Sequence, residues 1–532
     1  MISRYFKHVF LLPEFQLICA DGCNCYLVRA KEQQNNWFRW QKNLTFSSKF
    51  PSLQSQPNLK KYHGNDAFSL LHFFPKSLPV RENKNLKQIL KGSKMYDLVI
   101  ENANLVTCDK NHNVIWNASM AIADGSIQVI ESDSEKKIQH FATSQKIDAR
   151  NKIVMPGLIN MHCHAADSLF RGLVEELSLE AWLQKVWVAE KAILTPGTTY
   201  TGSVLGLAEN LLSGVTSVMD MFWYPNETVK AANDLGMRIS TGGIFFDYPG
   251  IGNRSHEDFL QEAEKFFEDY NSSEAVFPGV MPHGTYTVSP KHLKEAKKIA
   301  ERHNGLYHIH AAETLAEQSD ISERYGQSVI RHLHSNGLLD KQTILAHCVH
   351  LDEAEIQLIA DNESIVVHNP MSNLKLGSGI APIDKMFEAG VTLTLGTDGA
   401  ISGNDLDMWL TMRLAASLPK GTTLDPKVMN AKTVLHMATL NGAKALGKED
   451  KLGSLEVGKI ADFIFVDMDK IHAVPVFDPI THLVYSACKS DISDVFIGGK
   501  QVVNDGVIGT LDIKDILEDV RKLSPQIAAS LR

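Results

Sequence analysis

The sequence predicts an α/β protein, a (β/α)8 barrel of the TIM type with a small β-sandwich domain formed from both ends of the folded region. Between about residues 154 and 450, eight apolar runs typical of buried strands alternate with segments of helical periodicity. On both sides of this stretch, shorter alternating runs separated by turn residues indicate antiparallel strands. The chain of 532 residues is also longer than one hydrophobic core usually serves.

The flanking strands come first in the chain. Asp124-Gly125 is typical of a hairpin turn, and Gly498-Gly499 marks a second turn near the other end. We therefore expect residues 95–153 and 451–532 to form the two parts of the β-sandwich, the second with a C-terminal helix. The strands expected in these parts are 96–103, 117–123, 126–130, 461–466 and 495–503.

The barrel itself is expected over residues 154–450. The intervals between its apolar runs are long enough for crossover helices, which favours a closed parallel barrel over an open sheet. Segment 291–303 has the helical pattern, because Leu293, Ala296 and Ile299 share one apolar face. The eight strands are expected at 154–161, 217–221, 238–244, 276–282, 306–310, 343–347, 364–368 and 391–395.

Residues 1–94 differ from the rest, with 15 Lys and Arg against 5 Asp and Glu. They show no sustained period, and their composition is typical of a disordered N-terminal extension without a catalytic role. An organellar transit peptide is one alternative, and a folded module is another. Period-2 patterning begins abruptly at Met95.

The remaining chain is acidic, with 38 Lys and Arg against 57 Asp and Glu. Such a body repels phosphate backbones, so we expect a small-molecule substrate and no nucleic acid. No stretch of about 18 apolar residues predicts a membrane span. The seven cysteines show no disulfide framework, which indicates a cytoplasmic protein, or an organellar one if residues 1–94 are a transit peptide.

The first barrel run ends in His162-Cys163-His164. Side chains alternate along a strand, so residues two apart point the same way and can hold one metal ion. Active sites of such barrels lie at the C-terminal ends of the strands. We therefore predict His162 and His164 as metal ligands, with two incidental histidines as the alternative.

The fifth run ends in His308-Ile309-His310 and is followed by Glu313. Spacing alone offers two histidines on one face of the strand. We expect only His310, which lies nearer the C-terminal end, to reach the metal, with Glu313 as base beside a metal-bound water. The alternative is a core histidine with a surface glutamate.

The sixth and eighth runs end in His347 and in Gly396-Thr397-Asp398-Gly399. A carboxylate at the end of an apolar strand is costly unless it is paired or metal-bound, so Asp398 is predicted as a ligand rather than a helix N-cap. Three imidazoles and one carboxylate suit one divalent ion, Zn²⁺ in the first place and Fe²⁺ as the alternative.

Taken in order, these residues resemble the amidohydrolase superfamily, and the resemblance runs from about Tyr96 to Gly506. Within it, three further segments resemble the branch of methylthioadenosine/S-adenosylhomocysteine deaminases and triazine hydrolases. These segments are 165–172 with Leu183, 346–351 and 368–377. Residues 1–94 have no counterpart there.

The resemblance implies a mononuclear site in which His162, His164, His310 and Asp398 bind the metal. Glu313 and Asp398 would move protons, and His347 would polarise the attacked centre. Binuclear members carry a lysine at the end of the fourth strand, where this chain has 281–284 without one. The implied reaction adds metal-bound hydroxide to an amino-bearing ring carbon and expels ammonia.

The resemblance also implies substrate residues. Trp182 and Glu190 match a tryptophan and a ribose-binding glutamate, with core packing and a solvated helix face as alternatives. His283 matches a substrate-binding histidine. Arg254 lies near the second of two arginines that hold a carboxylate in some relatives, whereas Gly242-Gly243 occupies the expected place of the first. A small uncharged substrate is therefore favoured.

The function expected from these observations is hydrolytic deamination of an aminated heterocycle or nucleoside resembling an adenosine derivative. The first alternative is a hydrolase that removes chloride or an alkylamine from a triazine-type ring, although the retained Glu313 favours an amine leaving group. A non-catalytic scaffold is the alternative from another class. Such chains tend to lose metal ligands, and this one keeps all four. The resemblance also implies a homo-oligomer.

Overall fold

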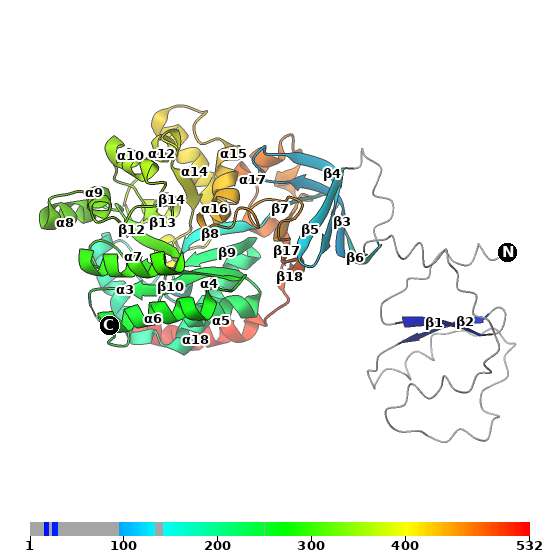
Figure 1. Ribbon diagram of the computed structural model, residues 1–532, viewed down its shortest axis with the longest axis horizontal. Helices are drawn as coiled ribbons and strands as arrows, with labels where there is room; N and C mark the ends of the chain where they lie inside the picture. Colours follow the sequence, from blue (N-terminus) through cyan, green and yellow to red (C-terminus); the bar gives the residue numbers. More distant parts are fainter. Residues whose placement is uncertain (1–14, 21–23, 30–94, 133–141, 249) are drawn as a thin grey trace, which may run out of the picture. The chain divides into compact units, whose positions relative to one another are not determined.

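The computed structural model describes residues 15–20, 24–29, 95–132, 142–248 and 250–532. Lys94–Arg532 form one compact unit, with a barrel and a smaller sheet (Figure 1). In the N-terminal part, strands β1 (Phe15–Ala20) and β2 (Asn24–Arg29) pair in antiparallel fashion. The disordered extension expected over residues 1–94 lies mostly outside the described residues and stays a prediction.

Eight parallel strands form the barrel and neighbour one another in chain order. Its first and last strands meet where the backbone N–H of Asp398 donates to the carbonyl of His162 at 3.0 Å. Seven of the predicted strands agree with the observed ones to within two residues. The strands are β8 (Leu158–Cys163), β9 (Val215–Asp220), β10 (Arg238–Phe245), β11 (Val276–Pro282), β12 (Leu306–Ala311), β13 (Thr343–His347), β14 (Ile365–His368) and β15 (Thr392–Leu395).

Helices between the strands cover the outside of the barrel (Figure 1). Helix α7 shows the amphipathic pattern: Leu293, Ala296 and Ile299 are buried while Lys294 and Lys298 are exposed. No described helix is long and apolar enough to cross a membrane. The helices that follow the eight barrel strands are η5 (Ala165–Phe170), α3 (Leu179–Ile193), α4 (Pro196–Leu212), α5 (Pro225–Leu235), α6 (His256–Tyr270), α7 (Pro290–His303), α8 (Leu315–Tyr325), α9 (Val329–Ser335), α10 (Glu353–Asp361), α11 (Pro370–Lys375), α12 (Ile383–Glu388), α13 (Ala400–Gly403), α14 (Met408–Thr423), α15 (Ala431–Met437) and α16 (Leu440–Ala445).

The smaller sheet draws strands from both sides of the barrel segment, which confirms the predicted fold class. The backbone N–H of Ile127 donates to the carbonyl of Lys459 at 2.8 Å, so the two halves are bonded to each other. Phe463, Phe465 and Phe496 pack in its core. The strands are β3 (Met95–Val106), β4 (Val114–Ala123), β5 (Ser126–Ser132), β6 (Ala142–Asp148), β7 (Lys152–Pro156), β16 (Phe463–Asp467), β17 (Ile492–Ile497), β18 (Lys500–Asn504) and β19 (Val507–Ile508).

The first barrel strand differs from the prediction. The single strand expected at 154–161 is two strands, because β7 pairs with β16 in the smaller sheet and only β8 enters the barrel. The chain changes sheets at Gly157, where an added Cβ would lie 2.2 Å from the Thr216 side chain. Both strands are buried, so an uninterrupted apolar run conceals the change of sheet.

The C-terminal segment returns to the barrel after the smaller sheet. Helix α17 (Pro479–Tyr485) packs on α14 and α15, and α18 (Ile513–Ala529) packs on α3 and α4. Ile516 and Ile527 of α18 join the apolar core of the barrel. Short 3-10 turns, η6 (Ile471–Ala473) and η7 (Lys489–Asp491), complete this region.

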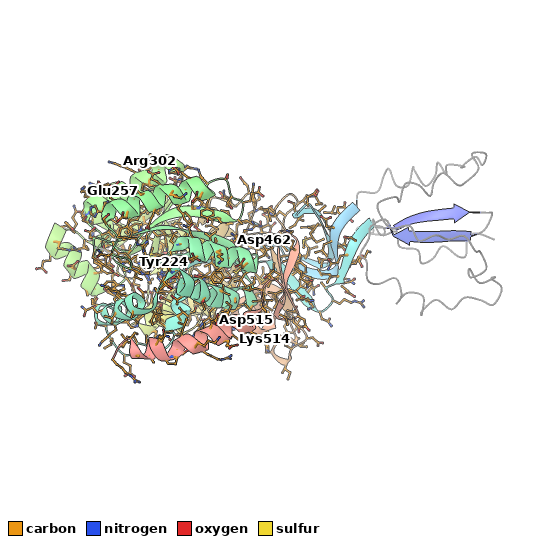
Figure 2. The ribbon with its side chains drawn as sticks, turned by 90° about the horizontal axis from the view of Figure 1, so that it is seen from below. Tyr224, Glu257, Arg302, Asp462, Lys514 and Asp515 are labelled. Carbon is orange, nitrogen blue, oxygen red and sulfur yellow. The ribbon has the colours of Figure 1, made fainter. Side chains whose placement is uncertain are left out.

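A buried ion pair joins the two parts of the fold. The guanidinium of Arg238, at the start of β10, donates to both carboxylate oxygens of Asp462 at 2.6 and 3.0 Å. Asp462 also accepts from the backbone N–H of Gly498 at 2.7 Å. Figure 2 shows Asp462 where the smaller sheet meets the barrel. The bidentate geometry fixes the start of β10 against the residue that directly precedes β16.

We expect Arg238→Met to lower the free energy of unfolding by about 3–5 kcal/mol, because it leaves the Asp462 carboxylate buried without its partner. Urea unfolding of the full chain measures this change. Lys146→Met is the matched control, since the Lys146–Glu101 pair is equally short at 2.6 Å but exposed and should contribute no more than about 1 kcal/mol. Equal effects of the two substitutions would contradict the prediction.

Candidate active site

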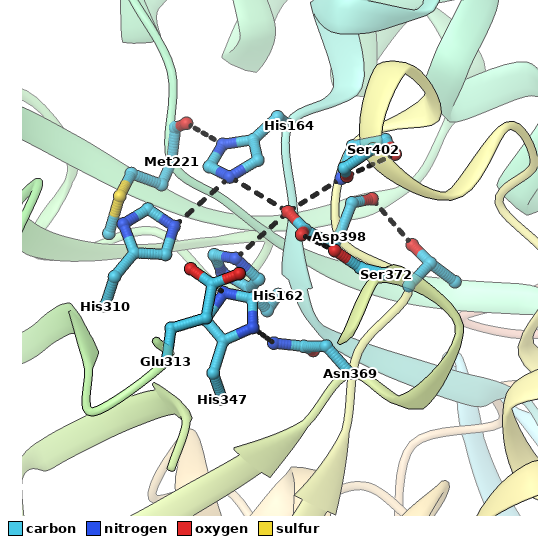
Figure 3. Close-up of polar contacts among 12 residues, drawn as sticks. His162, His164, Met221, His310, Glu313, His347, Asn369, Ser372, Asp398 and Ser402 are labelled. Carbon is cyan, nitrogen blue, oxygen red and sulfur yellow. Dashed lines mark hydrogen bonds and ion pairs between the residues drawn. The ribbon is translucent and has the colours of Figure 1, made fainter. Parts of the chain in front are cut away.

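Four predicted metal ligands converge at the C-terminal ends of the barrel strands (Figure 3). His162 lies in β8, His164 follows it directly, His310 lies in β12 and Asp398 follows β15. Ring nitrogens of the three histidines lie within 4.8 Å of one another. The carboxylate Oδ1 of Asp398 lies 3.3 Å from His162 Nε2 and 3.2 Å from His164 Nε2.

The orientation of the His162 ring is set by a second histidine behind it. His308 Nδ1 must donate to the carbonyl of Ile344, 3.2 Å away, because a carbonyl only accepts. Neutral His308 then accepts at Nε2 from His162 Nδ1, at 2.8 Å. This hydrogen-bond chain assigns the tautomer and leaves a lone pair on His162 Nε2, which is directed at the centre of the site.

His164 and His310 are oriented by backbone carbonyls in the same way. His164 Nδ1 donates to the carbonyl of Met221 at 2.6 Å, and His310 Nδ1 donates to the carbonyl of His283 at 2.5 Å. Their Nε2 atoms lie 3.3 Å apart. Both rings therefore direct Nε2 toward the centre of the site.

Asp398 is held by its own loop. Its backbone is in the left-handed region, with φ of 64°, and its side chain accepts from Ser372 Oγ at 2.5 Å and from Gly399 N at 2.9 Å. Burial alone raises the pKa of Asp398, but the neighbouring imidazoles of His162 and His164 hold this pKa well below its usual range. The carboxylate is therefore ionised and available as a ligand.

This group of residues fits a divalent metal ion. His162 Nε2 is buried and has no hydrogen-bond partner among the described residues, which is costly unless a metal binds there. Three neutral imidazoles and one carboxylate are a donor set that Zn²⁺ and Fe²⁺ both accept.

Glu313 and His347 lie together beside the four predicted metal ligands. Glu313 Oε1 accepts from Ser378 Oγ at 3.0 Å, and its Oε2 lies 3.7 Å from His347 Nε2. His347 Nδ1 donates to Asn373 Oδ1 at 2.8 Å. Burial raises the pKa of Glu313, and the charge of His347 only partly offsets this. A carboxyl with a raised pKa next to the metal ligands suits a group that moves protons.

A cavity with mostly apolar walls opens in front of these residues. His283 lies in one wall of the cavity, and its ring stacks on the ring of Phe246 with centroids 4.8 Å apart. Burial lowers the pKa of His283 to about 3, so this ring is neutral. Besides the predicted metal ligands, Glu313 and His347, the cavity is lined by Asp167, Leu179, Trp182, Leu183, Val186, Trp187, Glu190, Met221, Phe222, Trp223, Ile244, Phe246, His283, Tyr286, Leu376 and Ser402.

Three of the four predicted substrate residues reach this cavity. They are Trp182, Glu190 and His283. The indole N–H of Trp182 donates to the carbonyl of Val174 at 3.3 Å. Burial raises the pKa of Glu190 to about 7, and its Oε2 accepts from Trp223 Nε1 at 3.2 Å. Both Trp182 and Glu190 are thus buried in the cavity wall rather than solvated.

Arg254 is not among the residues that line the cavity. Its guanidinium forms an ion pair with Glu262 at 2.7 Å and lies 5.3 Å from the ring centroid of Trp223. At Gly242, an added Cβ would lie 1.8 Å from the carbonyl oxygen of Gly279 in the neighbouring strand. No arginine can therefore replace Gly242, and the described cavity lining contains no cationic Lys or Arg.

The residues that support the predicted ligands do not follow from the sequence alone. His308, Ser372 and Asn373 lie within motifs that were recognised, but nothing in their spacing shows which partner each one binds. Asp167 was part of the recognised segment 165–172 and was given no role. Its position three residues after His164, just beyond the end of β8, is the signal that the sequence offers.

The chain belongs to the amidohydrolase family, whose model matches residues 153–502. This is the class that the barrel and its ligand set define.

Among curated relatives, the chain is similar to a 5-methylthioadenosine/S-adenosylhomocysteine deaminase of Syntrophobacter fumaroxidans, at 39% identity over 82% of this chain and 99% of the relative. It is also 39% identical to a 5′-deoxyadenosine deaminase of Methanosarcina acetivorans, over 82% of this chain and 99% of the relative.

Solved structures agree with this assignment. An adenosine deaminase from Xanthomonas campestris with bound zinc matches 82% of this chain and all of its own, with a TM-score of 0.80 and 31% identity. An atrazine chlorohydrolase from Arthrobacter aurescens, complexed with zinc, matches 80% of this chain and all of its own, with a TM-score of 0.74 and 26% identity. The deaminases among these relatives confirm the predicted class, a hydrolase of non-peptide C–N bonds, and the zinc in both solved structures supports a divalent metal.

The role assigned to His308 predicts a specific effect on metal binding. His308→Met removes the acceptor behind His162 and should weaken the affinity of the full chain for Zn²⁺ by about 10–100-fold. His308→Gln places an amide oxygen near the position of Nε2 and should retain affinity to within a few-fold. Chelator competition measures both. Equal affinity of the two variants would show that His308 does not orient His162.

Metal affinity should also depend on pH with a defined slope. Burial lowers the pKa of His164, but Asp398 more than offsets this and raises it to about 10, whereas burial lowers the pKa of His162 to about 4. Without metal, His164 is therefore protonated at neutral pH, and a metal ion must displace one proton.

We expect the apparent association constant for Zn²⁺ to rise about tenfold per pH unit between pH 6.5 and 8.5. Chelator competition, corrected for protons that the chelator binds, measures the slope. An affinity that does not change over this range would contradict the protonated state of His164.

Proposed function

We propose that this enzyme deaminates the adenine ring of an adenosine derivative with a small, uncharged 5′ substituent. The observation that carries the proposal is a metal site bordered by Glu313 and His347 at one end of a cavity walled by aromatic and apolar side chains. The deaminases among the relatives support the reaction, and the absence of Lys and Arg from the described cavity lining supports an uncharged substituent.

The proposed ligands are His162, His164, His310 and Asp398, because their free donor atoms converge. A divalent metal ion held there supplies Lewis acidity and lowers the pKa of water from about 15.7 toward 7. Zinc is proposed over iron, and the zinc-containing solved relatives support this choice.

Glu313 is proposed as the residue that moves protons. Ser378 holds its Oε1, so Oε2 remains free to take a proton from water and to deliver it to the ring nitrogen of the substrate. His347, held at Nδ1 by Asn373, directs Nε2 toward the same place and can polarise the attacked centre. The neutral ring of His283 and the wall containing Trp182 orient the heterocycle.

Two properties of the whole protein are proposed on other observations. Ile471, Val474 and Phe477 are exposed in one loop, at 100%, 67% and 91%, which supports a homo-oligomer that covers them. Cys108, Cys163 and Cys348 are buried free thiols, which supports a reducing cytoplasmic location.

The full chain with zinc bound should release ammonia from 5′-methylthioadenosine and 5′-deoxyadenosine, and less readily from the carboxylate-bearing S-adenosylhomocysteine. An enzyme-coupled ammonia assay over adenine, guanine, cytosine and triazine compounds measures this. Chloride release from a chlorotriazine without ammonia release from any nucleoside would replace the proposal with the triazine-type reaction.

Glu313→Gln should lower kcat by about 10²–10⁴-fold, because it removes proton transfer, while bound zinc stays at the wild-type level. Glu180→Gln, an exposed change on α3, is the control and should leave kcat unchanged. A Glu313→Gln variant with wild-type kcat would exclude Glu313 from proton transfer.

A further inference from the structure

Glu317 is a buried acid behind the active site that the reaction described above does not use. It lies in the first turn of α8, and only 5% of it is exposed. It is not among the residues that line the cavity, so it does not touch a substrate there. A buried carboxyl is costly unless its oxygens are hydrogen-bonded, so its partners indicate what it does.

One oxygen of Glu317 binds the backbone of the residue that moves protons. The N–H of Glu313 donates to Glu317 Oε2 at 2.9 Å. Strand β12 ends at Ala311, and Ala312 has a left-handed backbone with φ of 53°, so strand pairing stops before Glu313. The carboxyl of Glu317 supplies the acceptor that a neighbouring strand no longer provides.

A glutamate at this place in a helix usually caps its own helix, and Glu317 does not. Thr314 and Glu317 have the spacing of a capping box, in which the glutamate binds the N–H of the N-cap residue. The N–H of Glu317 donates to Thr314 Oγ1 at 3.0 Å, but the side chain of Glu317 binds the N–H of Glu313 instead. The carboxyl is therefore directed at the active-site residue rather than at the helix end.

The other oxygen of Glu317 connects this segment to a second wall of the cavity. Thr285 Oγ1 donates to Glu317 Oε1 at 2.8 Å, and Thr285 is itself buried. Thr285 lies two residues after His283, whose ring lies in the cavity wall. Glu317 thus joins the segment that follows β11 to the segment that follows β12.

We propose that Glu317 is a positioning residue, which fixes the backbone of Glu313 and so keeps the Glu313 carboxyl beside His347. The inference rests on the proposed function and deepens it. Ser378 Oγ holds Glu313 Oε1 at 3.0 Å, and Glu317 holds the backbone from which this side chain extends. Glu313 Oε2 is thereby kept 3.7 Å from His347 Nε2. A displacement of about 1 Å in such an arrangement can cost 10²-fold in rate.

This role requires the hydrogen bonds of Glu317 rather than its charge. Burial raises the pKa of Glu317 to about 7, so the carboxyl is protonated part of the time near neutral pH. A protonated Oε1 donates to Thr285 Oγ1, because a hydroxyl accepts as well as donates. Glutamine keeps the same two contacts, with its carbonyl toward Glu313 and its amide N–H toward Thr285.

The test measures deamination of 5′-methylthioadenosine by the full chain with zinc bound. Glu317→Met keeps the length of the side chain but has no acceptor, and it should lower kcat about 10–100-fold while KM and bound zinc stay near wild type. Glu317→Gln should keep kcat within about threefold of wild type, because both hydrogen bonds remain. Glu323→Met, an exposed change on the same helix, is the matched control and should leave kcat unchanged.

A double substitution separates positioning from a general loss of stability. In the Glu313→Gln background, adding Glu317→Met should lower kcat by less than about threefold, because the proton transfer that Glu317 supports is already lost. Losses that multiply in full would overturn the inference. Glu317→Ala, which leaves room for water beside the N–H of Glu313, repeats both measurements if the methionine variant fails to fold.

A Glu317→Met variant with wild-type kcat would overturn the inference, as would a Glu317→Gln variant that loses as much activity as Glu317→Met. Wild-type enzyme that releases ammonia from no nucleoside would instead overturn the proposed function, and a Glu313→Gln variant with wild-type kcat would overturn the role of Glu313. The two failures are distinguishable, because the first appears only in variants of Glu317.

Discussion

The carboxylate of Asp398 is buried among the imidazoles of His162, His164 and His310. The rest of the structure must compensate for burying the oxygen and nitrogen atoms of these four side chains. Burial of such atoms is costly unless each has a partner. The atoms that face away from the centre are bound to the protein, through His308, two backbone carbonyls and Ser372. The inward-facing atoms of all four side chains are left to share one further partner. A metal ion satisfies all of them at once, so the ligand set and its supports form one unit.

Barrel closure brings this unit together. The ligands come from the first, fifth and last strands, and His162 and Asp398 meet only because β8 and β15 lie side by side. Close approach there requires glycine, since a Cβ at Gly396 would lie 2.9 Å from the backbone nitrogen of His162. The left-handed backbone of His347 and Asp398, with φ of 77° and 64°, turns both side chains toward the cavity. Such strain persists where the surrounding structure enforces it, and it is common at active sites.

The cavity has two chemically different regions. Beside the metal ligands, hydrogen bonds fix each polar group in one protonation state and orientation, as reaction at a ring carbon requires. Farther along, apolar and aromatic walls surround Asp167 and Glu190, and Asp167 Oδ1 has no hydrogen-bond partner among the described residues. The first region recognises the reacting end of a substrate, and the second recognises a part that does not react. Binding energy from the second region can then hold the ring in place for the reaction in the first.

The sequence by itself determined the class of fold and predicted four metal ligands that the structure brings together, because strand periodicity places alternate residues on one face and a parallel barrel gathers strand ends at one edge. It did not determine that residues 154–161 change sheets at Gly157, since both resulting strands are buried and equally apolar. Nor could spacing distinguish the roles of His308 and His310. His308 supports His162, a residue 146 positions away, and Arg254 pairs with Glu262 rather than facing the cavity. The tertiary structure decided these points, because hydrogen bonding and burial depend on which distant segments meet in space.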